Sequence, residues 1–220
     1  MAHALVIGSS GGIGRALVSE AEARGARVTG LSRSADGLDV TDEASVARVL
    51  GALEGPFDLV FVASGALTAG PDPEKAIKEV TPDALTDLFR VNALGPMLVL
   101  KHALPLLPRR GRAVFAALSA RVGSIGDNGI GGWHGYRASK AALNQLIHGA
   151  AIELSRTHRD AVAVCLHPGT VETPLTAPYA GRHATVTPDK AAARLLDVIE
   201  GLTPDQSGGF FDYAGREIPW

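Results

Sequence analysis

A tyrosine and a lysine four residues apart are the side chains of this sequence best suited to proton transfer. Tyr136 and Lys140 lie in the stretch Gly135–Lys140, which continues into residues of high helix propensity. On a helix, residues at this spacing share one face. A neighbouring ammonium favours the phenolate and lowers the pKa of a tyrosine from about 10. The pair therefore predicts a general acid or base that works near neutral pH.

A glycine-rich loop near the N-terminus is the second feature with a chemical meaning. Residues Gly8–Gly14 follow the apolar run Ala4–Ile7 and precede a helical stretch. Strand, glycine turn and helix in this order are typical of a dinucleotide site, because glycine backbone approaches a pyrophosphate closely and a helix N-terminus favours an anion. The spacing, with glycines at Gly8, Gly12 and Gly14, differs from the commoner Gly-x-Gly-x-x-Gly fingerprint. We expect a nicotinamide dinucleotide to bind here.

The end of the next predicted strand, Arg27–Leu31, bears on which dinucleotide binds. NAD-specific sites usually carry a carboxylate at this point, which accepts a hydrogen bond from the ribose 2′-hydroxyl. Here Ser32 and Arg33 follow the strand, and no carboxylate occurs before Asp36. A guanidinium fork suits a 2′-phosphate. The sequence therefore predicts NADPH in preference to NADH.

A proline inside a long predicted helix marks a further candidate site. The helix begins at Thr81-Pro82 and contains Asn92 and then Gly95-Pro96. Pro96 has no N–H group, so it cannot bond to the carbonyl of Asn92, and the helix should kink there. A free carbonyl beside an asparagine amide can hold an ordered water.

These residues depend on the elements that position them, and those elements alternate between strand and helix. This order predicts an α/β fold with a doubly wound, Rossmann-type parallel sheet of about seven strands and helices on both faces. No linker or internal repeat divides the chain, so residues 1–220 should form a single domain. The expected strands are Ala4–Ile7, Arg27–Leu31, Leu38–Val40, Phe57–Val62, Arg112–Leu118, Ala161–Leu166 and Gly209–Asp212.

Composition excludes several classes of function. The formal net charge is −2, and no basic cluster indicates nucleic acid or a membrane surface as a partner. No segment has the ~20 apolar residues needed to span a bilayer, and the N-terminus lacks a signal peptide. Cys165 is the only cysteine, and the seven histidines have no metal-ligand spacing. We expect a cytoplasmic protein without a metal.

Taken together, these motifs resemble those of the short-chain dehydrogenase/reductase family along almost the whole chain. The resemblance includes the glycine loop, Asp39-Val40, Asn92-x-x-Gly95, Tyr136-x-x-x-Lys140 and the stretch Pro168–Thr173. The similarity is greatest to a branch that contains carbonyl reductases. It implies that Tyr136 protonates a carbonyl oxygen while the nicotinamide delivers hydride, that Lys140 lowers the tyrosine pKa and holds the ribose, and that Asn92 fixes a water.

The resemblance also implies a set of cofactor contacts. Asp39-Val40 would contact adenine, and Thr173 would bond the carboxamide. After the fourth predicted strand the family's usual Asn-Asn-Ala-Gly is replaced by Val62-Ala63-Ser64-Gly65, which puts hydrogen bonds at that strand end in question. The implied cofactor-binding residues are Gly8, Ser10, Gly12, Ile13, Gly14, Ser32, Arg33, Asp39, Val40, Ala63, Ser64, Gly65, Tyr136, Lys140, Pro168, Gly169, Val171 and Thr173.

The catalytic serine of the family is the second departure. Alignment on Val122–Ile125 places Ala120 where that serine should stand, one residue after Ser119. Three possibilities are open: Ser119 brought round by a bulge in the strand, Ser124 from the following loop, or no serine. We favour Ser119, because the glycine-rich loop allows an irregular strand end.

The sequence thus favours an NADPH-dependent reductase of small ketones, aldehydes or quinones, or the reverse alcohol oxidation. The alternative is a nucleotide-binding signalling or regulatory protein with weak turnover, which the missing serine permits. The segment Pro174–Thr187 is short, which predicts a small substrate lid and an open site. The resemblance also implies a homodimer or homotetramer.

Overall fold

The computed structural model describes residues 1–70, 72–174, 176, 177 and 185–220. Six parallel strands form one sheet in the order β2-β1-β3-β4-β5-β6. The strands are β1 His3–Ile7, β2 Arg27–Leu31, β3 Leu59–Val62, β4 Ala113–Leu118, β5 Ala161–His167 and β6 Phe210–Asp212. The helices of four or more residues are α1 Gly12–Ala23, α2 Arg33–Asp36, α3 Glu43–Gly51, α4 Pro82–Phe89, α5 Gly95–Ala103, α6 His134–Leu154 and α7 Pro188–Gly201.

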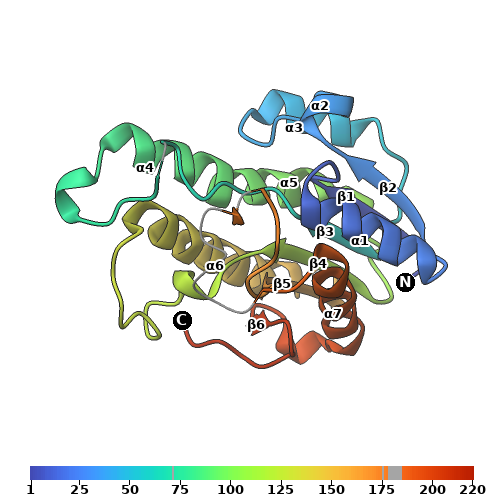
Figure 1. The fold of residues 1–220 in the computed structure, drawn as a ribbon. Coiled ribbons are helices and arrows are strands. Elements are labelled where there is room, and N and C mark those ends of the chain that lie inside the picture. Colours follow the sequence, from blue (N-terminus) through green and yellow to red (C-terminus); the bar gives the residue numbers. More distant parts are fainter. Residues whose placement is uncertain (71, 175, 178–184) are drawn as a thin grey trace.

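Helices cover both faces of this sheet, as the sequence predicts (Figure 1). In β4, Ala113, Phe115 and Ala117 pack on the side of α3, α5 and α6, and the alternate residues pack on the side of α1 and α7. Both sets are fully or almost fully buried, which explains why the strands read as continuous apolar runs. The doubly wound α/β class is confirmed.

The strand expected at Leu38–Val40 is wrong. Leu38 is buried in the core, but these residues form a loop between α2 and α3. The carboxylate of Asp39 accepts hydrogen bonds from the backbone N–H of Thr41 at 2.9 Å and from its hydroxyl at 2.7 Å. This local turn takes the place of a ladder with a neighbouring strand.

The kink expected at Asn92 takes the form of a π-helical turn, Arg90–Leu94, between α4 and α5. Such turns accommodate an extra residue in a helix. Asn92 is fully buried inside it. Gly95 directly follows the turn, and a Cβ atom there would lie 2.9 Å from Cγ2 of Val40. Glycine at this position therefore lets the helix approach the loop between α2 and α3.

No helix in the described part of the chain is long and apolar enough to cross a membrane. Three helices, α4, α5 and α6, lie together on one side of the sheet (Figure 1). The long helix α6 packs against α4, β5 and the π-helical turn. It is the element that brings Tyr136 and Lys140 to the carboxyl ends of the central strands.

Candidate active site

The carboxyl ends of parallel strands meet at one edge of the sheet, and the predicted site residues lie in the loops and helices that follow these strand ends. Several cavities among the described residues open there, and three of them hold the predicted site residues. We call them the glycine-loop cavity, the tyrosine cavity and the outer cavity, with volumes of about 390, 140 and 390 Å³. The tyrosine cavity shares Ala63, Ser64, Gly65 and Ala66 with the first, and it shares Ala120, Tyr136, His167, Gly169 and Thr176 with the third.

The glycine loop is built so that side chains cannot enter it. Gly8 has a φ of +85°, and a Cβ atom there would lie 2.9 Å from the backbone nitrogen of Ser64. A Cβ atom on Gly14 would lie 2.1 Å from the carbonyl oxygen of Gly8, and one on Gly12 would meet Thr173 at 2.9 Å. Only glycine fits these three positions without rearrangement. Backbone is thereby left open along the wall of the glycine-loop cavity, as a pyrophosphate requires.

Ser64 offers an independent sign that this wall takes a polar ligand. Its hydroxyl is buried and has no hydrogen-bond partner among the described residues, and it lines both the glycine-loop cavity and the tyrosine cavity. Unpaired buried hydroxyls are unusual in proteins because their desolvation is not compensated. The strand end itself is intact, since the N–H of Ala63 donates to the carbonyl of Ile7 at 2.8 Å. The residues present therefore fit a dinucleotide.

At the end of β2, the side chains point in different directions. Ser32 is buried and caps α2, and its hydroxyl accepts from the N–H of Ala35. The carboxylate of Asp36 turns back and accepts a hydrogen bond from the N–H of Ser32 at 2.7 Å. Arg33 is exposed and lines the glycine-loop cavity, whereas Asp36 does not. The cavity wall at this point therefore carries a guanidinium.

Asp39 and Val40 also line the glycine-loop cavity, as expected from the sequence. The hydrogen bonds from Thr41 lower the pKa of Asp39 below its ordinary value, so this carboxyl group is ionised at neutral pH. Its charge lies close to Arg33, which contributes to the lowering. Asp39 and Val40 thus place a charged and an apolar side chain next to each other in the lining of the glycine-loop cavity.

Tyr136 and Lys140 lie on one face of α6, and both line the tyrosine cavity. Lys140 is 3% exposed, and its ammonium donates a hydrogen bond to the carbonyl of Leu118 at 2.8 Å and lies 5.9 Å from the centre of the Tyr136 ring. Burial lowers the pKa of Lys140 to about 8. The lysine is therefore still mostly protonated at neutral pH.

The expected lowering of the tyrosine pKa does not occur among the protein's own groups. Burial raises the pKa of Tyr136 to about 12. Loss of solvation of the phenolate outweighs the attraction of an ammonium that lies beyond the ring and already donates to a carbonyl. Tyr136 is thus held as a neutral phenol, which is the form that donates a proton.

Asn92 connects two of these segments through its side chain. Its amide oxygen accepts from the N–H of Ala66 at 2.8 Å, and its amide nitrogen donates to the carbonyl of Ala66 at 2.8 Å and to the hydroxyl of Ser139 at 3.0 Å. Ser139 lies on α6 between Tyr136 and Lys140. Asn92 therefore ties the loop after β3 to the helix that carries the tyrosine.

The structure distinguishes the three possibilities for the catalytic serine, which are Ser119, Ser124 or no serine. The ladder between β4 and β5 continues regularly to the N–H of Ser119, which donates to Leu166 at 2.8 Å, so the expected bulge is not formed. Ser119 lines the tyrosine cavity, but its hydroxyl donates to the Asn144 side chain at 2.7 Å. Ser124 lines none of the three cavities. Ala120 lines both the tyrosine and outer cavities beside Tyr136.

The remaining predicted residues follow β5 and β1. The tyrosine cavity is lined by Ile13, Pro168, Gly169, Val171 and Thr173. Thr173 is held in place by Thr176, whose hydroxyl accepts from its N–H at 3.1 Å. Ser10 lines the glycine-loop cavity. All eighteen cofactor residues expected from the sequence therefore lie in or directly beside the connected cavities.

Two residues of the site were not recognised from the sequence. His167 ends β5 and lines both the tyrosine and outer cavities, with a buried Nδ1 atom that has no partner among the described residues. Burial lowers the pKa of His167 to about 4, so the ring is neutral. Glu74, in the loop after β3, lines none of the three cavities but supports the site from beside it: its buried carboxylate accepts from the N–H of Gly135, at the start of α6, at 3.3 Å. In the sequence, the position of His167 at the end of a strand is the only feature that indicates its place in the site. No local sequence feature indicates the position of Glu74.

Comparison with known proteins agrees with this geometry. Residues 2–183 match the family model described as short chain dehydrogenase. The chain is 33% identical to 1-hydroxy-2-glutathionyl-2-methyl-3-butene dehydrogenase of Rhodococcus sp. (strain AD45), over all of both chains. It is 40% identical to the C-signal of Myxococcus xanthus over 132 residues, which are 60% of this chain and 76% of the relative.

A solved structure extends the comparison to the cofactor. A short-chain dehydrogenase/reductase of Burkholderia multivorans with bound NADP has a TM-score of 0.80 to this chain and 29% sequence identity, and the match covers 100% of this chain and 99% of the other. That protein is similar in fold over its whole length. The bound NADP is an observation on the Burkholderia protein.

The buried lysine gives a prediction about stability. The pKa of Lys140 in the folded protein is about 8, against 10.5 for an ordinary lysine, so between these pH values the unfolded chain binds more protons and the stability of the parent rises with pH. In Lys140→Met this contribution is lost. We expect the free energy of unfolding of the variant, minus that of the parent, to fall by about 3 kcal/mol between pH 7 and pH 10.5.

Urea denaturation at a series of pH values measures this difference. Lys101→Met is the matched control, because Lys101 is exposed and pairs with Glu43 on the surface. A difference that stays constant with pH for Lys140→Met would mean that the ammonium is solvated.

Proposed function

Because the chain belongs to the short-chain dehydrogenase/reductase family and is therefore an oxidoreductase, we propose that it is an NADPH-dependent reductase of small carbonyl compounds. The reverse reaction, oxidation of the corresponding alcohols, uses the same groups. The observation that carries the proposal is the position of Tyr136 and Lys140. They lie where a cavity fit for a dinucleotide joins a second cavity that leads outward.

Tyr136 acts as the proton donor in this proposal. Its pKa of about 12 keeps it neutral, so it can give its proton to a carbonyl oxygen. The buried ammonium of Lys140 then stabilises the phenolate that remains, because opposite charges attract strongly where water is excluded. Tyr136 and Lys140 would lie beside a bound nicotinamide, which would supply the hydride for the carbonyl carbon.

Asn92 has a positioning function in this proposal. Its amide is occupied by Ala66 and Ser139, so a proton-relaying water would bind at its backbone carbonyl rather than at the side chain. The hydrogen bonds of the Asn92 side chain also fix the loop after β3 against α6. The family's relay of protons to solvent therefore stays a prediction for this chain.

The proposed cofactor is NADPH. Gly8, Gly12 and Gly14 would admit the pyrophosphate, and Arg33 would pair with the 2′-phosphate. The diversion of Asp36 to the backbone of Ser32 supports this choice, because Asp39 is the only carboxylate among the described residues that lines the wall of this cavity. The NADP in the similar Burkholderia structure is consistent with it.

A regulatory protein with weak turnover is the second candidate, and one observation favours it. Ala120 stands beside Tyr136 where the family has a serine, so one hydrogen bond to the carbonyl oxygen is missing. The name of the C-signal relative describes a signalling function in that organism. A screen for NADPH oxidation with aldehydes, diketones and quinones separates the two candidates.

Cytoplasmic location and a homodimer or homotetramer also stay predictions. Apolar side chains on the outer surfaces of α4, the π-helical turn and α6 are consistent with pairing through these elements. The exposed ones include Phe89, Leu94, Leu146 and Ile152. Light scattering at several concentrations would determine the oligomeric state.

The assignment of Tyr136 predicts a large loss of turnover in Tyr136→Phe. The substitution keeps the ring and removes the proton donor, so kcat should fall by about 10²–10⁴ while NADPH still binds. NADPH fluorescence titration and steady-state assays measure the two quantities. Tyr213→Phe is the control phenol, because Tyr213 lines none of the three cavities. Retention of most activity in Tyr136→Phe would remove this tyrosine from the mechanism.

The assignment of Arg33 predicts a change in cofactor preference. Loss of a charge-assisted fork to phosphate should weaken NADPH binding by roughly ten- to a hundredfold in Arg33→Ala and leave NADH affinity unaltered. The control is Arg159→Ala, which removes an exposed arginine away from these cavities. Calorimetric titration with both cofactors gives the dissociation constants. Equal affinity of the parent for NADPH and NADH contradicts the prediction.

The position of Ala120 predicts that a carbonyl donor can be restored there. A donor aimed at the developing oxyanion is typically worth about 10²–10³ in rate, so Ala120→Ser should raise kcat at least about tenfold. Ser119→Ala should have a smaller effect, because the Ser119 hydroxyl is already committed to Asn144. A collapse of kcat in Ser119→Ala, together with no gain in Ala120→Ser, would instead establish Ser119 as the donor.

A further inference from the structure

The outer cavity is mostly apolar but carries an excess of positive charge. Its described lining includes the apolar side chains of Leu67, Val122, Ile130 and Trp133 and the three charged residues Arg121, Asp127 and Arg137. His167 also lines it and is neutral at pH 7. Two cations and one anion leave the wall with a net positive charge directly beside Tyr136.

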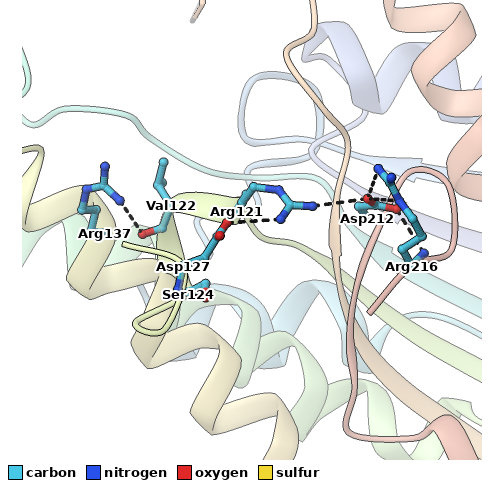
Figure 2. Close-up of polar contacts among 7 residues, drawn as sticks. All are labelled: Arg121, Val122, Ser124, Asp127, Arg137, Asp212 and Arg216. Atoms are coloured by element: carbon cyan, nitrogen blue, oxygen red, sulfur yellow. Dashed lines mark hydrogen bonds and ion pairs between the residues drawn. The ribbon is translucent and has the colours of Figure 1, made fainter. Parts of the chain in front are cut away.

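Arg121 is already neutralised by carboxylates. Its guanidinium lies 3.2 Å from Asp127 and 3.3 Å from Asp212, and Arg216 pairs with the same Asp212 at 2.8 Å, as Figure 2 shows. The Asp212 side chain is fully buried. These four side chains form a closed network of two cations and two anions. Arg121 therefore has little remaining attraction for an anionic ligand.

Arg137 is the cation that lacks a carboxylate. Its Nε donates to the carbonyl of Gly132 at 2.9 Å. Its Nη1 donates to the carbonyl of Val122 at 3.3 Å (Figure 2). No carboxylate in the described part of the chain forms an ion pair with it. The side chain is partly buried, and burial lowers the pKa of Arg137 below its ordinary value. A guanidinium held in this way is preorganised for an anion from outside the chain.

From this arrangement we propose that the outer cavity binds the carboxylate of an organic anion, with Arg137 as its partner. The substrate is then a carbonyl compound or alcohol with an apolar body and a carboxylate. The apolar body lies against Ile130 and Trp133, and the reacting oxygen lies at Tyr136, which immediately precedes Arg137 on α6. This inference rests on the proposed reductase function and names its substrate class.

Two sources supply this chemistry. One is a simple oxo acid, in which the carboxylate lies on the apolar body itself. The other is a thiol conjugate of a short peptide, such as the glutathionyl compound in the name of the Rhodococcus relative. In both, a carboxylate several bonds from the reacting carbon pairs with the same guanidinium.

Two matched pairs of compounds test the inference. The first pair is 4-carboxybenzaldehyde and its methyl ester, and the second is S-phenacylglutathione and its diethyl ester. Each pair is assayed for kcat/KM with NADPH, using the parent, Arg137→Met, Arg137→Lys and the exposed control Arg156→Met. We expect the parent to prefer the acid over the ester by at least about tenfold in one pair, and Arg137→Met to lose that preference.

The ratio of acid to ester within each protein separates recognition of charge from a general loss of folding. Arg137→Lys should keep part of the preference, because it retains the charge and loses the fork. The pair that shows the effect identifies the source of the carboxylate. Equal ratios for the parent and Arg137→Met, with both esters reduced, would overturn the inference and leave the reductase function intact.

A binding measurement covers the case of no turnover. Saturation-transfer NMR with 4-carboxybenzaldehyde and S-phenacylglutathione detects contact with the parent directly. If none of the four compounds is reduced, the reductase proposal fails for them, and binding of an acid that is lost in Arg137→Met would still support the carboxylate site. Absence of binding by both acids would overturn it.

Discussion

A positive charge buried at the end of a β-strand is the constraint on which the rest of the site depends. The ammonium of Lys140 is sheltered from water and hydrogen-bonded to the carbonyl of Leu118, so α6 must lie directly against the end of β4. Gly123 makes that approach possible, since a Cβ atom there would lie 2.8 Å from the Lys140 Cβ. Burial of an ammonium is unfavourable unless it is compensated. The hydrogen bond to the carbonyl of Leu118 provides this compensation, and it holds α6 against the end of β4.

The architecture and the main site residues could be predicted because their signals are local. Buried parallel strands read as apolar runs, glycines mark a loop whose backbone must stay open, and Tyr136 and Lys140 are one helical turn apart. The stretch Leu38–Val40 misled for a related reason. Its buried Leu38 resembles a strand residue, but the turn formed by Asp39 and Thr41 depends on side-chain hydrogen bonds that apolar patterning does not reveal.

The rest depends on contacts between distant parts of the chain. The bond from Ser119 to Asn144 spans 25 residues, and that from Gly135 to Glu74 spans 61. The pKa of Tyr136 likewise reflects how deeply the folded chain buries the ring, whereas spacing alone indicated only a neighbouring cation. Arg137 reads in the sequence as an ordinary surface residue of a helix. Its lack of an acidic partner became visible only with the folded structure.

The salt-bridged network around Asp212 ties the final segment of the chain to the wall of the outer cavity. Arg121 lies in the segment that follows β4, Asp212 is the last residue of β6, and Arg216 follows four residues later (Figure 2). Asp212 and Arg216 thereby hold Arg121, a residue of the outer cavity wall, although they lie far from Tyr136 in sequence. Substitutions at Asp212 or Arg216 can therefore alter the position of Arg121 in the outer cavity wall while α6 stays unaltered.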